Sequence, residues 1–466
     1  RTVKGLNLSG ISAHHCHRMP AAQKCVRYTT PHGSRPHDQN VAYRLLHAIH
    51  LAVASATSII GPHPASRAPA HLQDGIMKIT DVEAIALAVP MEKQIAAPIS
   101  MPRADEVAPV VFKEYRSVIV RIRTDNGLEG VGECMTRLSG TALRDIVHYV
   151  KPLLIGKDPR DVEYLWDLLW SVMINRGHHS GFYLEALAGI DTALWDIWGK
   201  SAGVPVWRLL GGKTNPKLWA YASSLRLRDI EILRDEIDNH KANGFNAMKI
   251  KIGKDPMNWR GEMKTVEQIK EHAGDDVTLM ADVNCGYGHD LKTALQVGQA
   301  LEAMNLYWYE EPLAPDDIEG YAYLKDKLGI RIATGEADFN RFSFARFFKR
   351  DAIDIVQHDA ARAGGITEAR KIADMASAFH VQYAPHTGSS SNIIMTVSLH
   401  LATYAPNFLI YEYMQSDWNK EQHNPLHWDL CQLPIKSFKD GYLEMEDKPG
   451  LGIELNEEVI EKYRLK

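Results

Sequence analysis

Short apolar runs alternate with amphipathic stretches between residues 218 and 412. The stretches between the runs, such as 292–304 and 366–378, carry apolar residues at helical spacing. This alternation predicts strand–helix units around a parallel sheet, and eight candidate strands, beginning with 218–222, predict one β/α barrel. A polar residue stands at or near the end of each of the last seven runs, at intervals of 23 to 31 residues. These residues are Lys251, Asp282, Glu310, Glu336, Asp359, His386 and Glu412.

Three consecutive members of this series are acidic: Asp282, Glu310 and Glu336. The carboxyl ends of parallel barrel strands meet at one rim, so three carboxylates placed there can close on one hard divalent cation. A single acid at a strand end more often marks only the point where solvent begins. Three in step, each before a helical stretch, favour a metal site.

The segments outside the predicted barrel differ in character. Residues 77–216 contain two strand-like runs, an Asn-Gly hairpin turn and helical stretches, which predict an α+β domain. Residues 217–436 hold the barrel, and 437–466 are predicted to form short strands that return to the α+β domain. Residues 1–76 contain only two acids against eight Lys/Arg and nine His, with little periodicity. We interpret them as a non-structural extension, with a transit peptide, translated upstream sequence and a folded domain as alternatives.

Composition narrows the class of protein. A chain of 466 residues with 45% hydrophobic and 24% charged residues is typical of a globular protein. A net charge of −5 gives no reason to expect nucleic acid as a partner, and no apolar run approaches the roughly 20 residues that cross a bilayer. The five scattered cysteines indicate a reducing compartment, so we expect a cytoplasmic protein unless residues 1–76 direct it elsewhere.

Several motifs occur in a fixed order and carry a family resemblance. The chain resembles the enolase superfamily, specifically the mandelate racemase subgroup, from Met77 to Lys466. The resemblance implies an α/β fold in which an α+β capping domain covers a modified TIM barrel, (β/α)7β, with one Mg2+ per subunit. We also expect a homo-oligomer. The motifs are residues 188–200 and 203–212, Lys249-Ile-Lys251, Asp282-Val-Asn284, Glu310-Glu-Pro312, Gly335-Glu336, Asp359 with Ala363-Gly-Gly365, and Pro385-His386.

The predicted metal site suits chemistry beside a carboxylate. Protons next to a carboxylate are weakly acidic, so their removal needs a base and a cation that stabilises the enediolate. Three carboxylates leave open positions on Mg2+ for a substrate carboxylate and a water. We interpret Asn284 as a neutral hydrogen-bonding group beside the ligands. Glu311 is expected to orient Glu310 or its neighbours rather than to bind metal.

Two residues are candidate bases. Lys251 lies close to the predicted cation and to Lys249, and both disfavour its charged form, which should lower its pKa. Lys249 should remain charged and face the substrate carboxylate. The KxK pair could be a solvated strand face, but its apolar neighbours indicate a buried strand. Histidine has an ordinary pKa near neutrality, so His386 can form a catalytic pair with Asp359.

Two further assignments rest on the resemblance. Glu412, at the end of the last predicted strand, resembles the family's group that hydrogen-bonds a substrate carboxylate oxygen when it is protonated. Ser223, after the first strand, resembles the residue that holds the same carboxylate.

Two bases allow either racemisation of a 2-hydroxy acid or dehydration of a sugar acid to a 2-keto-3-deoxy acid. Polar and charged residues in the expected cap loops favour the polar sugar acid as substrate. A muconate-type cycloisomerase is disfavoured, because that branch resembles a pattern with a second lysine in place of the Asp359–His386 pair. A non-catalytic barrel is disfavoured because every expected group is present. The cap-loop residues that favour a sugar acid are Arg103, Asp105, Glu106, Arg137 and Ser139.

Overall fold

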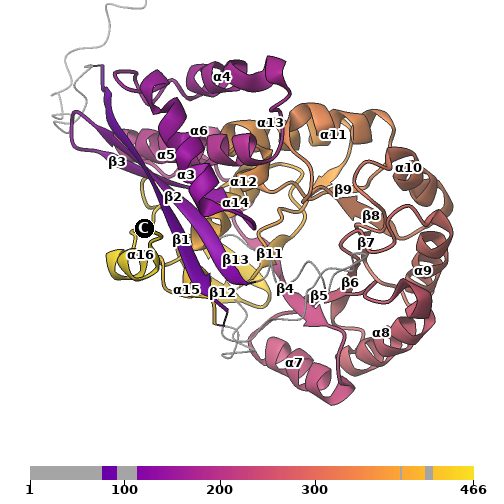
Figure 1. The fold of residues 1–466 in the computed structure, drawn as a ribbon. Helices are drawn as coiled ribbons and strands as arrows, with labels where there is room; N and C mark the ends of the chain where they lie inside the picture. Colours follow the sequence, from indigo (N-terminus) through magenta and orange to yellow (C-terminus); the bar gives the residue numbers. More distant parts are fainter. Residues whose placement is uncertain (1–75, 92–112, 389–390, 415–422) are drawn as a thin grey trace, which may run out of the picture. The chain divides into compact units, whose positions relative to one another are not determined.

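The computed structural model describes residues 76–91, 113–388, 391–414 and 423–466 (Figure 1). The chain divides after Asp74, and Gly75–Lys466 form one compact unit. The predictions for the N-terminal extension, apart from Ile76, and for the loop residues Arg103, Asp105 and Glu106 lie outside the described residues.

The capping domain is built on a three-stranded antiparallel sheet in the order β1-β2-β3. Its strands are β1 (Ile79–Pro90), β2 (Glu114–Thr124) and β3 (Glu129–Met135), and its helices are α3 (Gly140–Val150), α4 (Val162–Met173), α5 (Phe182–Ala202) and α6 (Val206–Leu210). Helix α5 packs against β3, and the backbones of the two elements lie unusually close together. A Cβ at Gly132 would lie 2.0 Å from the carbonyl oxygen of Gly189, so only glycine fits there.

Eight parallel strands form the barrel (Figure 1). They are β4 (Leu218–Arg226), β5 (Ala247–Lys251), β6 (Thr278–Asp282), β7 (Trp308–Glu310), β8 (Arg331–Thr334), β9 (Ile355–Val356), β10 (Gln382–Tyr383) and β11 (Tyr411–Tyr413). Neighbours from β4 to β10 pair in parallel, β11 pairs with β4, and a bridge between Tyr383 and Phe408 closes the ring.

Helices follow the first seven barrel strands and surround them. They are α7 (Ile230–Ala242), α8 (Trp259–Ala273), α9 (Leu291–Ala303), α10 (Ile318–Lys327), α11 (Asn340–Lys349), α13 (Ile366–Ala378) and α14 (Asn392–Tyr404), with a short α12 (Ala360–Ala363) before α13. Seven strand–helix units and a final strand confirm the predicted (β/α)7β barrel with its α+β cap.

Several acids near the rim serve only as helix caps. The side chains of Asp229, Asp290 and Asp317 accept backbone N–H bonds at the starts of α7, α9 and α10. Such caps satisfy the free N–H groups of the first helical turn. They account for acids that the predicted site does not use.

The C-terminal segment contacts both barrel and cap. After α15 (Pro425–Trp428), the hairpin of β12 (Ile435–Lys439) and β13 (Tyr442–Met445) adds antiparallel to the start of β4. Helix α16 (Glu457–Tyr463) then leads to β1, where the Leu465 N–H donates to the Ala86 carbonyl at 2.8 Å.

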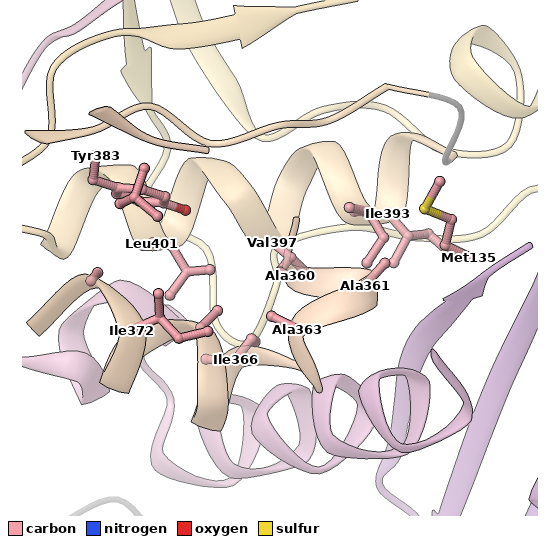
Figure 2. Close-up of a cluster of buried hydrophobic side chains, with 14 of the residues drawn as sticks. Met135, Ala360, Ala361, Ala363, Ile366, Ile372, Tyr383, Ile393, Val397 and Leu401 are labelled. Carbon is pink, nitrogen blue, oxygen red and sulfur yellow. The ribbon is translucent and has the colours of Figure 1, made fainter. Parts of the chain in front are cut away.

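Apolar packing joins the cap to the barrel helices. Figure 2 shows Met135, at the end of β3, beside Ile393 of α14 and Ala361 of α12. These side chains belong to the main hydrophobic core, which runs from the cap into the barrel wall. Burial of this kind contributes roughly 25 cal/mol for each Å² of apolar surface removed from water.

Buried acids of α5 also form hydrogen bonds with other parts of the chain. Asp191 accepts bonds from the N–H (2.9 Å) and hydroxyl (2.5 Å) of Thr367 in the first turn of α13. Asp196 accepts from the N–H groups of Val131 (2.9 Å) and Leu451 (2.8 Å), which joins β3 to the C-terminal segment. The motif at 188–200 thus stabilises the junction between domains.

Among the described residues, no helix is both long and apolar enough to span a membrane.

We expect a chain that begins at Met77 to fold with an unchanged melting temperature and to keep its kcat. The compact unit starts beside this residue, Met77 is buried, and the Lys78 N–H is bonded to Asp125 at 2.9 Å. Thermal unfolding and steady-state kinetics of the full and shortened chains would check this. A large drop in either would show that residues 1–76 contribute a structural element.

Candidate active site at the barrel rim

The site stands on a closed apolar layer inside the barrel. One buried residue from each of the eight strands, or from the residues flanking it, forms this floor. Side chains two residues apart on a strand share a face, so each strand sends its next inward residue toward the carboxyl rim. The floor residues are Tyr221, Ala247, Met280, Trp308, Ala333, Ile355, Ala384 and Ile410. Two positions further along stand Ser223, Lys249, Asp282, Glu310, Gly335, Gln357, His386 and Glu412.

The third acid reaches the rim by a break in this alternation. Gly335 follows β8 with φ +138°, and a Cβ there would lie 3.0 Å from the Gln357 nitrogen. Glycine therefore lets the chain turn close to the next strand, and Glu336, one position later, occupies the rim. Asp282, Glu310 and Glu336 each offer an oxygen within 4.8 Å of the other two. The three acids that the sequence predicts as metal ligands therefore lie close together in the structure.

The carboxylate of Glu310 is held from three sides. It accepts bonds from the Lys249 ammonium (2.7 Å), the Trp308 indole N–H (3.0 Å) and the Gln357 amide (2.8 Å). Burial, and then the charge of Asp282, raise the pKa of Glu310 to about 8. A divalent cation among these oxygens would relieve the repulsion, and three hard oxygen donors fit Mg2+.

Lys249 is buried beside three acids. Its ammonium lies 2.7 Å from Glu310, 3.0 Å from Glu412 and 3.2 Å from Asp282. Burial alone would lower the pKa of Lys249, but the charges of Glu310 and Glu412 raise it well above its ordinary value. Lys249 is therefore a fixed positive charge.

Lys251 lies two positions after Lys249 on β5, and its side chain is partly exposed. Its ammonium contacts Asp282 and donates to the side-chain oxygen of Asn284 at 3.1 Å. Asn284 has a left-handed backbone, with φ +47°, and its N–H donates to Asp282 at 2.9 Å. Asn284 thus binds both the candidate base and a candidate metal ligand, as expected of a neutral hydrogen-bonding neighbour.

The Asp359–His386 pair forms on adjacent strands. The Nδ1 of His386 lies 2.8 Å from a carboxylate oxygen of Asp359, whose other oxygen accepts the Ala361 N–H at 2.8 Å. The Nε2 faces Glu336 at 3.1 Å. Burial acts to lower the pKa of His386, but Glu336, Glu412 and Asp359 raise it well above its ordinary value. The imidazole is thus poised to carry a proton toward the triad.

Glu412 and Ser223 are bonded to each other. The Ser223 hydroxyl donates to one carboxylate oxygen of Glu412 at 2.6 Å, and the Thr387 N–H donates to the other at 2.7 Å. Burial acts to raise the pKa of Glu412, yet Lys249 and His386 bring it down to about 2. The role that the resemblance implies for Glu412 requires a protonated carboxyl, whereas the lowered pKa favours its ionised form.

The expectation that Glu311 orients Glu310 or its neighbours stays a prediction. The groups that orient Glu310 are Lys249, Trp308 and Gln357, and in the described part of the chain no hydrogen bond joins the Glu311 side chain to Glu310. Glu311 is buried with φ +45°, and burial and the charge of Glu336 raise its pKa well above the ordinary value.

Sequence reasoning missed Gln357 and Trp308. Trp308 lies on a predicted strand and Gln357 directly follows another, so a period-two count from Glu310 and Ile355 would have placed both inside the barrel. Arg137, considered only as a loop charge, lies near Glu336 and Asp359, and burial, together with the charge of Arg362, lowers its pKa.

Two family descriptions match the chain. Residues 89–211 match the N-terminal domain of mandelate racemase and muconate lactonizing enzyme, and residues 233–459 match the enolase C-terminal domain-like family.

Curated relatives are similar over most of their length. The D-galactarolactone cycloisomerase of Agrobacterium fabrum is 32% identical, over 77% of this chain and 94% of that protein. The arabinonate dehydratase of Saccharolobus solfataricus is also 32% identical, over 75% of this chain and 91% of that protein. Among solved structures, the 3,6-anhydro-D-galactonate cycloisomerase from Zobellia galactanivorans superimposes with a TM-score of 0.72 at 29% identity, covering 84% of this chain and 100% of that one.

Proposed function

The chain belongs to the mandelate racemase and muconate lactonizing enzyme family of the enolase superfamily, and we propose that it removes water from a sugar acid to give a 2-keto-3-deoxy acid. The observation that carries this proposal is the placement of two proton-transfer groups on either side of the acidic triad. Lys251 contacts Asp282 at one end, and His386 faces Glu336 at the other. The arabinonate and galactonate dehydratases among the relatives support the same reaction class.

The triad would hold Mg2+, which supplies a Lewis acid that stabilises negative charge on the substrate carboxylate. Lys249 adds a fixed positive charge beneath that carboxylate, and Ser223 offers a hydroxyl beside it. Lys251, in its neutral form, accepts the proton from C2. The electron pair of the C2–H bond then forms a double bond to C3.

His386 completes the reaction at C3. As the C3–O bond breaks, protonated Nε2 gives its proton to the leaving hydroxyl, which departs as water. The enol that remains takes up a proton at C3 while its C2 hydroxyl loses one, and it becomes the 2-keto-3-deoxy acid. Asp359 holds Nδ1, so Nε2 is directed at the substrate.

A sugar-acid cycloisomerase is the second candidate, favoured by two of the relatives. Here the same proton abstraction at C2 would expel a ring oxygen instead of water. The product would have the mass of the substrate. The two reactions share the residues above, so the product distinguishes them.

We expect turnover of at least one member of a library of mono- and diacid sugars, with a product that has lost one water and reacts as a 2-keto acid. Mass spectrometry and semicarbazide absorbance would measure both properties. The library should include lactones and anhydro sugars as the control for ring opening. A product of unchanged mass would contradict dehydration, and inversion at C2 alone would indicate a racemase.

A further inference from the structure

Glu133 is a fully buried carboxylate of the cap that the mechanism above does not use. It lies on β3 and accepts four hydrogen bonds. One oxygen accepts from the hydroxyl of Ser117 (2.8 Å) and the N–H of Ser391 (2.7 Å). The other accepts from the hydroxyl of Ser391 (2.6 Å) and the N–H of Ile394 (3.2 Å).

Three of these four donors belong to the barrel, at the start of α14. The first N–H groups of a helix lack partners within the helix and carry partial positive charge, so an anion stabilises them. Ser391 caps α14 from its own chain segment, with its hydroxyl accepting the Ile393 N–H at 3.1 Å. Glu133 adds a second, charged cap supplied by the other domain.

The same chain segment carries His386. It leaves β10, passes His386 and Thr387, and enters α14 at Ser391. Its beginning is held by Glu412, which accepts the Thr387 N–H at 2.7 Å while its carbonyl accepts the Thr387 hydroxyl at 2.9 Å. Its end is held by Glu133. Between these two points Gly388 packs on the imidazole, because a Cβ there would lie 2.7 Å from Nε2.

We propose that Glu133 is a positioning residue: from the cap it fixes Ser391 at the start of α14, five residues after His386, and so holds Nε2 in line with the acidic triad. Proton transfer is sensitive to placement, and a misplacement of about 1 Å can lower a rate by roughly 10²-fold. The expected effect of Glu133 on the rate rests on the proposed function, in which His386 is the proton donor. The expected effect of Glu133 on the start of α14 does not depend on that function.

Glu133→Gln tests the charge and the acceptor pattern without changing size. Each oxygen of Glu133 faces one backbone N–H, so the amide nitrogen of Gln would meet a donor whichever way it is turned. We expect kcat to fall by about 10- to 100-fold, with KM and Mg2+ affinity unchanged. Asp191→Asn is the matched control, because Asp191 is an equally buried cap carboxylate at the start of α13. It should lower the melting temperature comparably but leave kcat near wild type.

A milder pair covers the case in which Glu133→Gln does not fold. Ser391→Ala and Ser117→Ala each remove one hydroxyl from the same carboxylate, the first from the barrel segment and the second from the cap. Only Ser391→Ala should lower kcat.

A double mutant shows whether Glu133 acts through His386. In a His386→Asn background, Glu133→Gln should cause no further loss of kcat/KM, because residues that act as a unit are not additive. An equal loss in both backgrounds would overturn the proposal. So would a kcat loss in Asp191→Asn equal to that in Glu133→Gln.

Amide hydrogen exchange tests the contact without any substrate. Peptides that cover 384–396 should exchange faster in Glu133→Gln and remain as in wild type in Asp191→Asn, where 365–372 should change instead. Unchanged exchange at 384–396 in Glu133→Gln would overturn the proposal. If the wild-type protein dehydrates no sugar acid, the proposed function fails while this measurement still decides whether Glu133 holds the segment.

Discussion

Chelation should abolish turnover, and added Mg2+ should restore it. Asp282, Glu310 and Glu336 converge within 4.8 Å, and without a cation burial and the charge of Asp282 raise the pKa of Glu310 to about 8. Dialysis against a chelator followed by a Mg2+ titration of kcat would measure the requirement. Asp282→Asn should lose both Mg2+ binding, followed by calorimetry, and activity. Asp290→Asn, which removes an acid that only caps α9, should lose neither.

Metal binding should also release protons when the solution is below about pH 8. Glu310 must be ionised to bind a cation, and its pKa is raised in the cation-free site. Apparent Mg2+ affinity should therefore weaken as the pH falls through this value. Full activity after exhaustive removal of divalent ions would refute the metal site altogether.

His386→Asn should lower dehydration by roughly 10²–10⁴-fold, the usual contribution of a general acid or base. Asparagine cannot protonate the leaving hydroxyl, while Lys251 and the triad stay intact. Asp359→Asn should have the same effect in a weaker form, because it disturbs the imidazole's orientation and charge without removing it. His400→Asn is the control for loss of a buried histidine. His400 bonds the Trp207 N–H and the Leu451 carbonyl, away from the site, so that variant should lose stability but little kcat.

Deuterium exchange at C2 separates the two proton-transfer groups. In His386→Asn, exchange should continue if the C2 hydrogen of the substrate faces Lys251, and Lys251→Met should remove it. With the opposite C2 configuration His386 is the base, and exchange vanishes in His386→Asn. Wild-type dehydration by His386→Asn on the true substrate would contradict the two-base mechanism.

The regular spacing of strand ends explains why much of the site could be predicted from the sequence. Once the apolar runs are identified as parallel strands, their ends must meet at one rim, which located Asp282, Glu310, Glu336 and His386. The barrel and its cap were predictable for a related reason, since each depends on local periodicity.

The remaining features depend on contacts between distant segments or on exceptional backbone angles. The left-handed backbone of Glu311 has no signal in the alternation of apolar and polar residues. The ionised state of Glu412 depends on Lys249 and His386 together, which no linear pattern reveals. Glu133 and Ser391 are 258 residues apart, so their bond could not be inferred from spacing.

The carboxylates of the cap also constrain how such enzymes can be recombined. Glu133, Asp191 and Asp196 are each satisfied by N–H groups outside the cap's own helices, on α14, α13 and the C-terminal segment. A buried acid without its donors costs about 1–3 kcal/mol or more. A cap transplanted from a relative would therefore need a host barrel and tail that present donors at the same places. The cap, the barrel and the C-terminal segment therefore have to be exchanged together. A chimera joined at the domain boundary would separate these carboxylates from their donors.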